Sequence, residues 1–374
     1  MNEAVIVGYV RSPFHFAGKG ALAKTRPDDL AAAVVKGLIA TTGLNAADIE
    51  DLLLGCAFPE GEQGLNVARL ISFIAGLPQS AGAATINRFC GSSMQAIHSA
   101  AGAIAIGAGD VFVCAGIESM SRVPMMGFNP MPNPQLAEKM PSAYVSMGIT
   151  AENLAKKYGI PRRAQEEFAV ASHAKAAKAR EAGKFKDEIV VLPITNEDGC
   201  IRPEANLEAL AGLKPAFDQT GAVTAGTSSP LTDGAAACLV VSADYARKHN
   251  LPVLAKIKSI AIAGCAPDIM GIGPVVATRK ALDRAGLSIN DIDIIEMNEA
   301  FAVQAMACLR DLNIDMSRVN IDGGALALGH PLGATGARIT GKAAALLKRE
   351  KKKYALATQC IGGGQGIATI LEAV

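Results

Sequence analysis

The sequence predicts an α/β protein in which helices cover both faces of the sheets. Short runs of β-branched and small apolar residues are bounded by glycine and alternate with segments of helical periodicity. Glycine is abundant (38 of 374 residues) and aromatic residues make up only 4%, a composition that suits close packing of helices on sheets. The third observation is an internal repeat that relates the two ends of the chain.

The expected strands are runs of residues at 4–8, 110–116, 237–241, 354–358 and 367–371. Cys90 begins a segment in which apolar side chains fall on one helical face (Met94, Ile97, Ala101 and Ile104). His330 is followed by a second segment of this kind (Ile339, Ala343, Leu346 and Leu347). Residues 150–183 are expected to form two helices separated near Gly159-Ile-Pro161.

Residues 119–150 have a different character, because this segment is rich in proline and methionine. A long irregular segment in a compact protein is usually functional or covered by a partner. Methionine side chains are adaptable, so they could line an apolar ligand channel or a partner surface. Packing within an ordinary loop explains them equally well.

The repeat relates residues 42–53 to residues 285–296 with a constant separation of 243. The matching pairs are Gly43 and Gly286, Leu44 and Leu287, Asp48 and Asp291, and Ile49 and Ile292. Cys90 and His330, which are 240 residues apart, each precede a helical segment and then a strand. Any two βα units share some features, but two blocks agree here in order and spacing. We therefore expect two related halves, roughly 1–118 and 254–374, packed as a pseudo-dimer.

Charge and composition exclude several classes of protein. The formal net charge of +1 argues against a protein built to bind nucleic acid or an anionic membrane. No run of 18 apolar residues occurs, so no membrane span is expected. The first residues lack the basic and apolar regions of a secretory signal, which predicts a cytoplasmic protein. Eight cysteines without a C-x-x-C pair and five scattered histidines predict free thiols and no metal site.

The sequence lacks two common nucleotide-binding motifs. Residues 336–342 fit the first seven positions of a P-loop, but Ala343 stands where a hydroxyl would hold magnesium, and the segment continues a helical pattern. No G-x-G-x-x-G fingerprint of a dinucleotide-binding fold occurs.

Four stretches contain residues suited to chemistry. Cys90 lies at a tight turn before a helix, whose free N–H groups favour thiolate; an inert buried cysteine is the alternative. His330, held between Gly329 and Pro331, could take a proton from a thiol. Cys360 lies at a strand end followed by small residues whose N–H groups could bind an oxyanion. Asn298 follows a strand and could hold a water or a carbonyl oxygen, although alone it is better explained as a turn residue. Packing of the two halves could bring all four into one site.

Taken together, these stretches resemble the thiolase family along essentially the whole chain. The resemblance is carried by the Cys90, Asn298, His330 and Cys360 blocks together with residues 5–8, 116–121, 147–152, 213–217, 223–229 and 233–237, all in family order. It implies a five-layered α-β-α-β-α core of two duplicated halves. It also implies three parts: an N-terminal half (1–118 plus about 231–253), a loop domain over the coenzyme A (CoA) site (119–230) and a C-terminal half (254–374).

The resemblance also implies acyl exchange between carbon and the sulfur of CoA, and it assigns roles to the site residues. Cys90 becomes acylated, and His330 activates it. His330 and a water on Asn298 hold the thioester oxygen, and Cys360 is the acid/base. The N–H groups of Cys90 and Gly362 form a second oxyanion hole.

CoA is implied as a co-substrate, with no permanently bound cofactor. The residues that would line its pantetheine channel are Leu213, Met147, Phe217, Ala225, Ser229, Ala300 and Phe301. Arg202 matches a position near the adenine, and a solvated surface arginine is the alternative.

Ser146, Thr227 and residues 265–271 resemble the degradative 3-ketoacyl-CoA thiolases of fatty acid β-oxidation. An acetoacetyl-CoA-forming acetyltransferase is the alternative within the family. A non-catalytic acyl-CoA or lipid carrier and a cysteine hydrolase are alternatives from other classes. The family resemblance further implies a homodimer or homotetramer, with or without a hydratase/dehydrogenase partner subunit.

Overall fold

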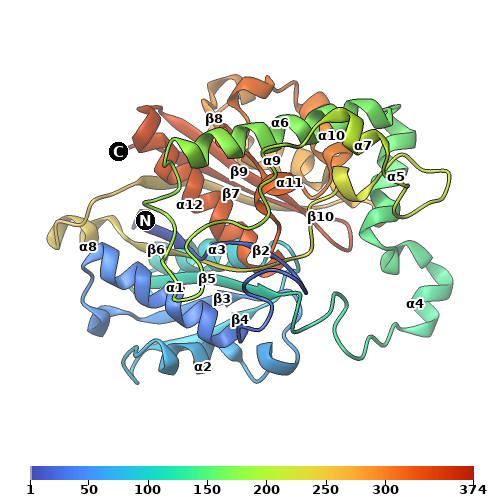
Figure 1. Cartoon of the computed structure of the whole chain (residues 1–374). Coiled ribbons are helices and arrows are strands. Elements are labelled where there is room, and N and C mark those ends of the chain that lie inside the picture. The colour runs from blue at the N-terminus through green and yellow to red at the C-terminus, as the bar shows by residue number, and fades with distance from the viewer. Residues whose placement is uncertain (1) are drawn as a thin grey trace.

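The computed structural model describes residues 2–374, and its strands form one mixed sheet in the order β4-β3-β5-β6-β1-β7-β10-β9-β8, with β2 beside β6 (Figure 1). The strands are β1 Ala4–Arg11, β2 His15–Phe16, β3 Asp51–Gly55, β4 Gly82–Ile86, β5 Val111–Ser119, β6 Thr232–Ser242, β7 Ala255–Gly264, β8 Ile294–Met297, β9 Tyr354–Ile361 and β10 Gln365–Glu372. The helices are α1 Pro27–Thr42, α2 Val67–Ile74, α3 Ser92–Ala105, α4 Pro134–Lys139, α5 Met147–Tyr158, α6 Arg162–Glu181, α7 Leu207–Ala211, α8 Ala243–Lys248, α9 Gly273–Ala285, α10 Ala302–Leu312, α11 Ala325–Leu328 and α12 Leu332–Glu350.

The two ends of the sheet repeat the same topology. In the first half β1, β6 and β5 are antiparallel neighbours, and β3 and β4 then continue in parallel. In the second half β7, β10 and β9 are antiparallel and β8 is parallel to β9, with a parallel bridge from Ile295 to Val319 where a fifth strand would lie. The duplication expected from the sequence repeat is therefore confirmed.

The halves meet along β1 and β7, where only two residue pairs join the strands. Because this connection is so short, the strands of each half form their own sheet, although hydrogen bonds link all of them in one order. Three large apolar clusters separate the layers, because successive side chains of a strand point to opposite faces. Val5 and Val7 of β1 face α1 and α2, whereas Ala4 and Ile6 face a central layer made by α3 and α12.

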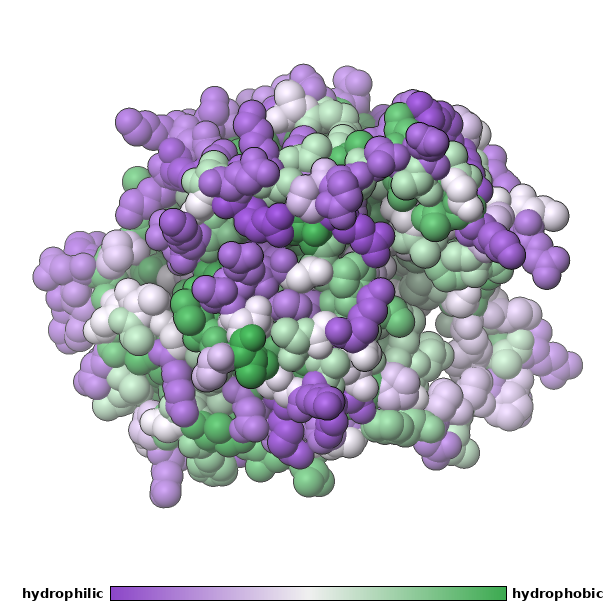
Figure 2. Space-filling model, in the orientation of Figure 1, coloured by the Kyte–Doolittle hydropathy of each residue, from purple (hydrophilic) through white to green (hydrophobic). Residues whose placement is uncertain are grey.

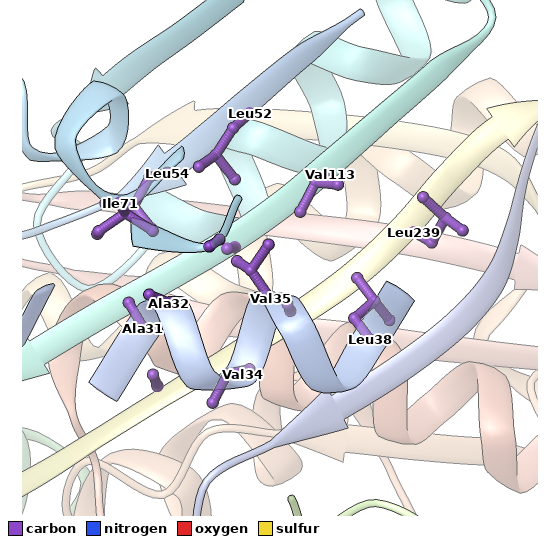
Figure 3. Packing of buried hydrophobic residues seen from close by; sticks show 14 of the residues in the cluster. Ala31, Ala32, Val34, Val35, Leu38, Leu52, Leu54, Ile71, Val113 and Leu239 are labelled. Atoms are coloured by element: carbon purple, nitrogen blue, oxygen red, sulfur yellow. The ribbon is translucent and has the colours of Figure 1, made fainter. Parts of the chain in front are cut away.

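The third cluster lies between the second sheet and helices α9 and α10. The order of the layers is therefore helices α1 and α2, the first sheet, helices α3 and α12, the second sheet, and helices α9 and α10. Figure 3 shows the interface between α1 and the first sheet, where Val35 and Leu38 lie against Val113 and Leu239. The predicted α/β class with five layers is confirmed.

All five predicted strands and the four predicted helices are present. The break between α5 and α6 falls at Gly159, which ends α5 in the left-handed conformation. Residues 336–342 lie inside α12, where the buried Lys342 pairs with Glu188 and Asp322 instead of facing a phosphate. This segment is therefore a buried part of a helix and not a phosphate-binding loop.

The methionine-rich segment carries α4 at the periphery of the molecule (Figure 1). Its methionines at 125, 126, 131 and 140 are exposed. Over the face drawn in Figure 2, hydrophobic and hydrophilic residues are interleaved. Across residues 2–374, none of the helices is both long enough and apolar enough to span a bilayer.

Candidate active site

Cys90 lies in the turn between β4 and α3, as the sequence predicts. The preceding residue, Phe89, has a φ of 43°, a left-handed conformation that is uncommon for a bulky side chain. The Ser92 hydroxyl stabilises the turn, because it accepts the Arg88 N–H (2.9 Å) and donates to the Phe89 carbonyl (2.6 Å). Gly91 caps α3, and a Cβ there would lie 2.5 Å from Ile361 Cδ1, so glycine lets the turn approach β9 closely.

The Cys90 thiol is protonated at rest. Burial raises its pKa to about 12, and the nearby carboxylate of Glu118 contributes in the same direction. The backbone N–H groups of Gly362 and of Cys90 itself act on the pKa in the opposite direction. A base is therefore needed to form the thiolate.

Cys360 is the second thiol of the site. It lies in β9, one residue before the strand ends, and it is buried. Burial raises its pKa well above the ordinary value, and the adjacent Cys90 raises it further. The neighbouring Gln359 donates from its side-chain amide to the Cys90 carbonyl. The structure therefore brings Cys90, Cys360 and Gly362 together.

His330 and Asn298 form the polar pair of the site. Asn298 Nδ2 lies 3.3 Å from His330 Nε2, and His330 Nδ1 lies 2.6 Å from the Thr335 hydroxyl oxygen. Thr335 donates its own hydrogen to the Pro331 carbonyl at 3.1 Å, so its oxygen accepts from Nδ1–H. This arrangement leaves the lone pair on Nε2. Burial lowers the His330 pKa to about 3, with a contribution from Arg338, and the imidazole is neutral.

Asn298 follows β8 directly, and its N–H donates to the Thr358 carbonyl of β9 at 3.0 Å. Because Cys360 is two residues further along β9, the amide and the thiol are held on neighbouring strands. Among the described residues, Asn298 Oδ1 has no hydrogen-bond partner and no hydrogen bond joins the Cys90 thiol to His330. Asn298 Oδ1 can therefore accept from a water, whose second hydrogen can be donated to a substrate oxygen. Through its contact with Asn298, the imidazole lies beside the strand that carries Cys360.

Three positioning residues were not identified from the sequence. Thr335 orients the imidazole, and the Thr232 hydroxyl accepts the His330 N–H at 3.1 Å. Glu118 is a fully buried carboxylate near Cys90. The signal that could have revealed Glu118 is its position within a strand that is otherwise uninterruptedly buried, where an unpaired carboxylate would be costly.

Most of the predicted CoA-contacting residues gather beside this site. Met147 begins α5, and its sulfur lies close to Gly362. The Phe217 and Phe301 rings meet edge to face at 5.9 Å, and Phe217 packs on the helix turn that follows Met147. The Ser229 N–H donates to the Ala300 carbonyl at 2.9 Å.

Two further predicted contacts belong to the same neighbourhood. Leu213 packs against Gly226, which follows Ala225 in a short 3₁₀ turn, Ala225–Thr227. Arg202 is separate from this group: its guanidinium lies over the Phe16 ring at 5.1 Å, and its N–H donates to His173. The side chain is exposed, as the alternative interpretation of a surface arginine expects.

Residues 2–374 contain no group of three or more histidine, cysteine, aspartate or glutamate side chains arranged to hold a metal ion. Each of the eight cysteines is a free thiol.

Comparison with known proteins gives the family. The model of the thiolase N-terminal domain matches residues 4–244, and that of the thiolase C-terminal domain matches residues 251–373. The 3-ketoacyl-CoA thiolase of Bacillus subtilis is 48% identical over 389 aligned residues, which cover 100% of both chains. The protein of the same name from Colwellia psychrerythraea is 47% identical over 387 residues, with the same coverage.

Solved structures agree with the sequence comparison. Human mitochondrial 3-ketoacyl-CoA thiolase superposes with a TM-score of 0.93 at 36% identity, covering 100% of this chain and 99% of that one; a complex of that enzyme with CoA matches equally well. The acetyl-CoA acetyltransferase of Bacillus anthracis has the same TM-score at 38% identity, covering 100% of this chain and 99% of its own. In sequence and in fold, the chain belongs to the thiolase family.

Proposed function

We propose that the protein is an acetyl-CoA C-acyltransferase that cleaves a 3-ketoacyl-CoA with CoA, giving acetyl-CoA and a shortened acyl-CoA. The observation that carries the proposal is the turn of Cys90 at the start of α3, which contacts β9 on both sides of the second thiol, Cys360. The Gln359 amide donates to the Cys90 carbonyl, and Gly91 packs against Ile361. The neutral His330–Asn298 pair would supply a base and an amide, since the Asn298 N–H is bonded to Thr358, two residues before Cys360 on β9. Two thiols and a neutral base suit thioester exchange better than hydrolysis.

In the first half-reaction His330 Nε2 takes the proton of the Cys90 thiol while the sulfur bonds to the 3-keto carbon. With pKa values of about 12 for the Cys90 thiol and about 3 for the imidazole, a Cys90 thiolate–imidazolium pair is disfavoured before substrate binds. Proton transfer therefore accompanies carbon–sulfur bond formation. The Cys90 and Gly362 N–H groups hold the oxyanion that forms on the former keto oxygen.

Collapse of this intermediate breaks the bond between the 2- and 3-carbons and leaves an acyl group on Cys90. The electron pair moves to the 2-carbon as the enolate of acetyl-CoA. The protonated His330 and a water on Asn298 stabilise the thioester oxygen, and the Cys360 thiol delivers its proton to the 2-carbon. Acetyl-CoA then leaves.

The second half-reaction returns the enzyme to its first state. The Cys360 thiolate takes the proton of an incoming CoA thiol, whose sulfur attacks the acyl group on Cys90. The Cys90 sulfur leaves and recovers the proton from His330. The covalent intermediate thereby divides one difficult exchange into two steps that use the same groups.

The CoA chain would run between Met147, Phe217 and Phe301 toward the two thiols. Apolar side chains and a close edge-to-face aromatic pair suit the pantetheine arm, which carries few charges. We include Leu213, Ala225, Ser229 and Ala300 in this channel, with Arg202 as the more distant candidate for the adenine end. We also assign residues 119–230 to a loop domain between a first half (1–118 and about 231–253) and a second half (254–374).

The degradative direction and a role in β-oxidation of fatty acids are supported by the names of the full-length relatives, which are 3-ketoacyl-CoA thiolases. The acetoacetyl-CoA-forming alternative is supported by the structural likeness to an acetyl-CoA acetyltransferase. Rates of thiolysis of acetoacetyl-, medium- and long-chain 3-ketoacyl-CoA separate the two. A preference confined to acetoacetyl-CoA would contradict the degradative assignment.

The direct test is intact-mass analysis after incubation with a 3-ketoacyl-CoA in the absence of CoA. We expect an acyl adduct on Cys90 that disappears when CoA is added, and no thiolysis by Cys90→Ala. An unmodified Cys90, or full activity of Cys90→Ala, would refute the proposal. Release of free acid without CoA would indicate a hydrolase, and binding without turnover would indicate a carrier.

The partner at the edge of the sheet would be a second copy of this chain. β4 is an edge strand with a largely accessible face, and apolar side chains of the α2 region beside it are exposed, including Leu65 (89%) and Phe73 (51%). We infer a cytoplasmic homodimer or homotetramer, working alone or with a hydratase/dehydrogenase partner subunit. Light scattering on the wild type and on Phe73→Lys would test this; a wild-type monomer would refute it.

A further inference from the structure

Glu118 is the buried carboxylate that connects the two sides of the site. It lies near the end of β5 and is only 1% exposed. Oε2 accepts the Ala57 N–H at 2.8 Å and the Gly333 N–H at 2.9 Å. Oε1 accepts the Gln63 side-chain amide at 2.8 Å and the Phe58 N–H at 3.3 Å.

The four N–H donors fit an ionised carboxylate, and the Cys56 thiol also lies 3.9 Å from Oε1. Each oxygen receives two N–H groups, and a protonated carboxyl would have to point its hydrogen at one of these donors. Burial raises the pKa of Glu118, and the four donors lower it again in part. A buried carboxylate that accepts this many hydrogen bonds is held in one position. Removal of its charge leaves several N–H donors without an acceptor.

One of these bonds reaches the segment that carries the base. Gly333 is the second residue of α12, three residues after His330, and its N–H has no partner within the helix. The Glu118 charge also faces the positive end of the α12 dipole. Gly116 and Gly333 approach so closely that a side chain on either would overlap the other strand or helix backbone.

The other contacts of Glu118 lie on the loop beside the turn that carries Cys90. Ala57 and Phe58 follow β3, and the Phe58 ring packs against Phe89, the residue before Cys90, at a centroid distance of 6.0 Å. Gly116, two residues before Glu118 in β5, packs against Ser93, three residues after Cys90, and the Glu118 charge raises the pKa of the Cys90 thiol. Glu118 therefore contacts the α12 start in the second half of the chain and the loop supporting Cys90 in the first.

We propose that Glu118 is a positioning residue that fixes the start of α12, and with it His330, relative to Cys90, while its negative charge holds Cys90 in the thiol form until substrate arrives. The proposal rests on the proposed function for its effect on turnover, because the reaction requires the imidazole to meet the thiol. Its effect on the Cys90 thiol does not depend on which reaction follows.

The test uses Glu118→Gln, which keeps the shape but removes the charge and places an NH2 group against N–H donors. We expect a fall in kcat of about 10- to 100-fold with little change in KM for CoA, because the CoA channel lies on other elements. We expect the opposite effect on alkylation of Cys90 by iodoacetamide: its pH profile moves to lower pH, because a negative charge has been removed. A purely structural role would not speed one reaction while slowing the other.

The matched control is Glu152→Gln. Glu152 is a buried carboxylate that accepts the Ala222 and Val223 N–H groups at 2.9 Å, but it has no contact with Glu118 or α12. It controls for general destabilisation and should leave the Cys90 alkylation profile unchanged. Hydrogen exchange at the start of α12 should accelerate in Glu118→Gln only.

If Glu118→Gln does not fold, Gln63→Ala removes one donor and keeps the carboxylate, and a smaller loss of kcat is expected. The proposal is refuted if Glu118→Gln keeps kcat within twofold, or if its alkylation profile moves no further than that of Glu152→Gln. If the wild type forms no acyl adduct, the proposed function fails instead, and the alkylation and exchange results still decide the role of Glu118.

Discussion

At the scale of single residues, the site depends on which nitrogen of His330 carries the proton. The Thr335 hydroxyl accepts from Nδ1 and passes its own hydrogen to a backbone carbonyl, so Nε2 is left as the base. Because the pKa of His330 is about 3, the imidazole is neutral throughout the range from pH 5 to 8. In this pH range the residues around His330 therefore determine which nitrogen carries the proton, because the ring has no charge to control.

Thr335→Val should therefore lower kcat by about 10- to 100-fold, because a methyl group replaces the acceptor that fixes the tautomer. KM for CoA should change little. Steady-state thiolysis rates at pH 7–8 provide the measurement, and circular dichroism shows whether the fold is kept. Thr335→Ser retains a hydroxyl and should recover most of the activity; equal losses in both variants would contradict this role.

The sequence predicts the candidate catalytic residues but not the residues that hold them. Each of the blocks that contain Cys90, Asn298, His330 and Cys360 has a structural alternative when taken alone, and it is their combination in family order that selects them. The contact between Glu118 and Gly333 spans 215 residues and leaves no trace in local periodicity. Thr335 lies in a helix that the sequence predicts, but its side chain direction depends on the loop before it.

At the scale of elements, the most demanding feature is the central pair of helices between the two sheets. α3 and α12 cross where Gly336 meets the backbone of Met94, and a Cβ at Gly336 would overlap the Met94 nitrogen. Two helices fit in this layer because small residues line their contact. The apolar faces predicted for both helices do point into this layer, but the sequence pattern does not reveal which glycines set their separation.

A pair of glycine substitutions tests this packing. Gly336→Ala should lower the free energy of unfolding by about 1–3 kcal/mol, because backbone atoms must move. At Gly102 in α3, no heavy atom lies within 4 Å of an added methyl group. Gly102→Ala should therefore raise the free energy of unfolding by about 0.5–1 kcal/mol, because alanine has the higher helix propensity. Urea unfolding of both variants is the measurement, and a neutral Gly336→Ala would show that the helices can separate without cost.

The sequence pattern predicts the central strands of the sheet better than the edge strands. The five expected strands are central and nearly continuously buried, which makes their apolar runs distinct. The residues of β4 are largely accessible to solvent and include Gly82, Ala83 and Ala84. The strand therefore lacks the run of large apolar residues that would distinguish it from a loop in the sequence. Pairing with β3, and not side-chain burial, makes it a strand.

At the scale of the whole molecule, the two halves and the segment between them share a buried ionic cluster. Arg11 of β1 pairs with Glu188 and Asp198, and Lys342 of α12 pairs with Glu188 and Asp322. Breaking such a cluster leaves a buried charge without its partner, which is far more costly than losing a surface ion pair. The cluster therefore specifies how the halves meet, in addition to the apolar layers.

The cluster and the buried histidines respond to acid in different ranges. The pKa of Glu188 is lowered and that of Asp322 is about 2, so both remain ionised in the folded state, and their stabilisation is lost only below the unfolded pKa values near 4. Burial instead lowers the pKa of His98 and His330 to about 3 and that of His173 to about 4. Below pH 6.5 these histidines bind protons in the unfolded chain but stay neutral in the folded chain. The free energy of unfolding therefore falls as the pH is lowered.

Between pH 6.5 and 4.5 the histidines should therefore dominate acid destabilisation. Each histidine lowers the free energy of unfolding by up to about 1.4 kcal/mol per pH unit as the pH falls. Burial raises the pKa of Glu296 to about 7, so the folded chain binds one more proton there than the unfolded chain, and this offsets the effect of one histidine. Replacement of one buried histidine isolates the effect: His98→Asn, compared with the exposed His249→Gln, should reduce the slope of unfolding free energy against pH by about one proton. Urea unfolding at several pH values measures this slope, and an unchanged slope in His98→Asn would mean that His98 is protonated in the folded protein.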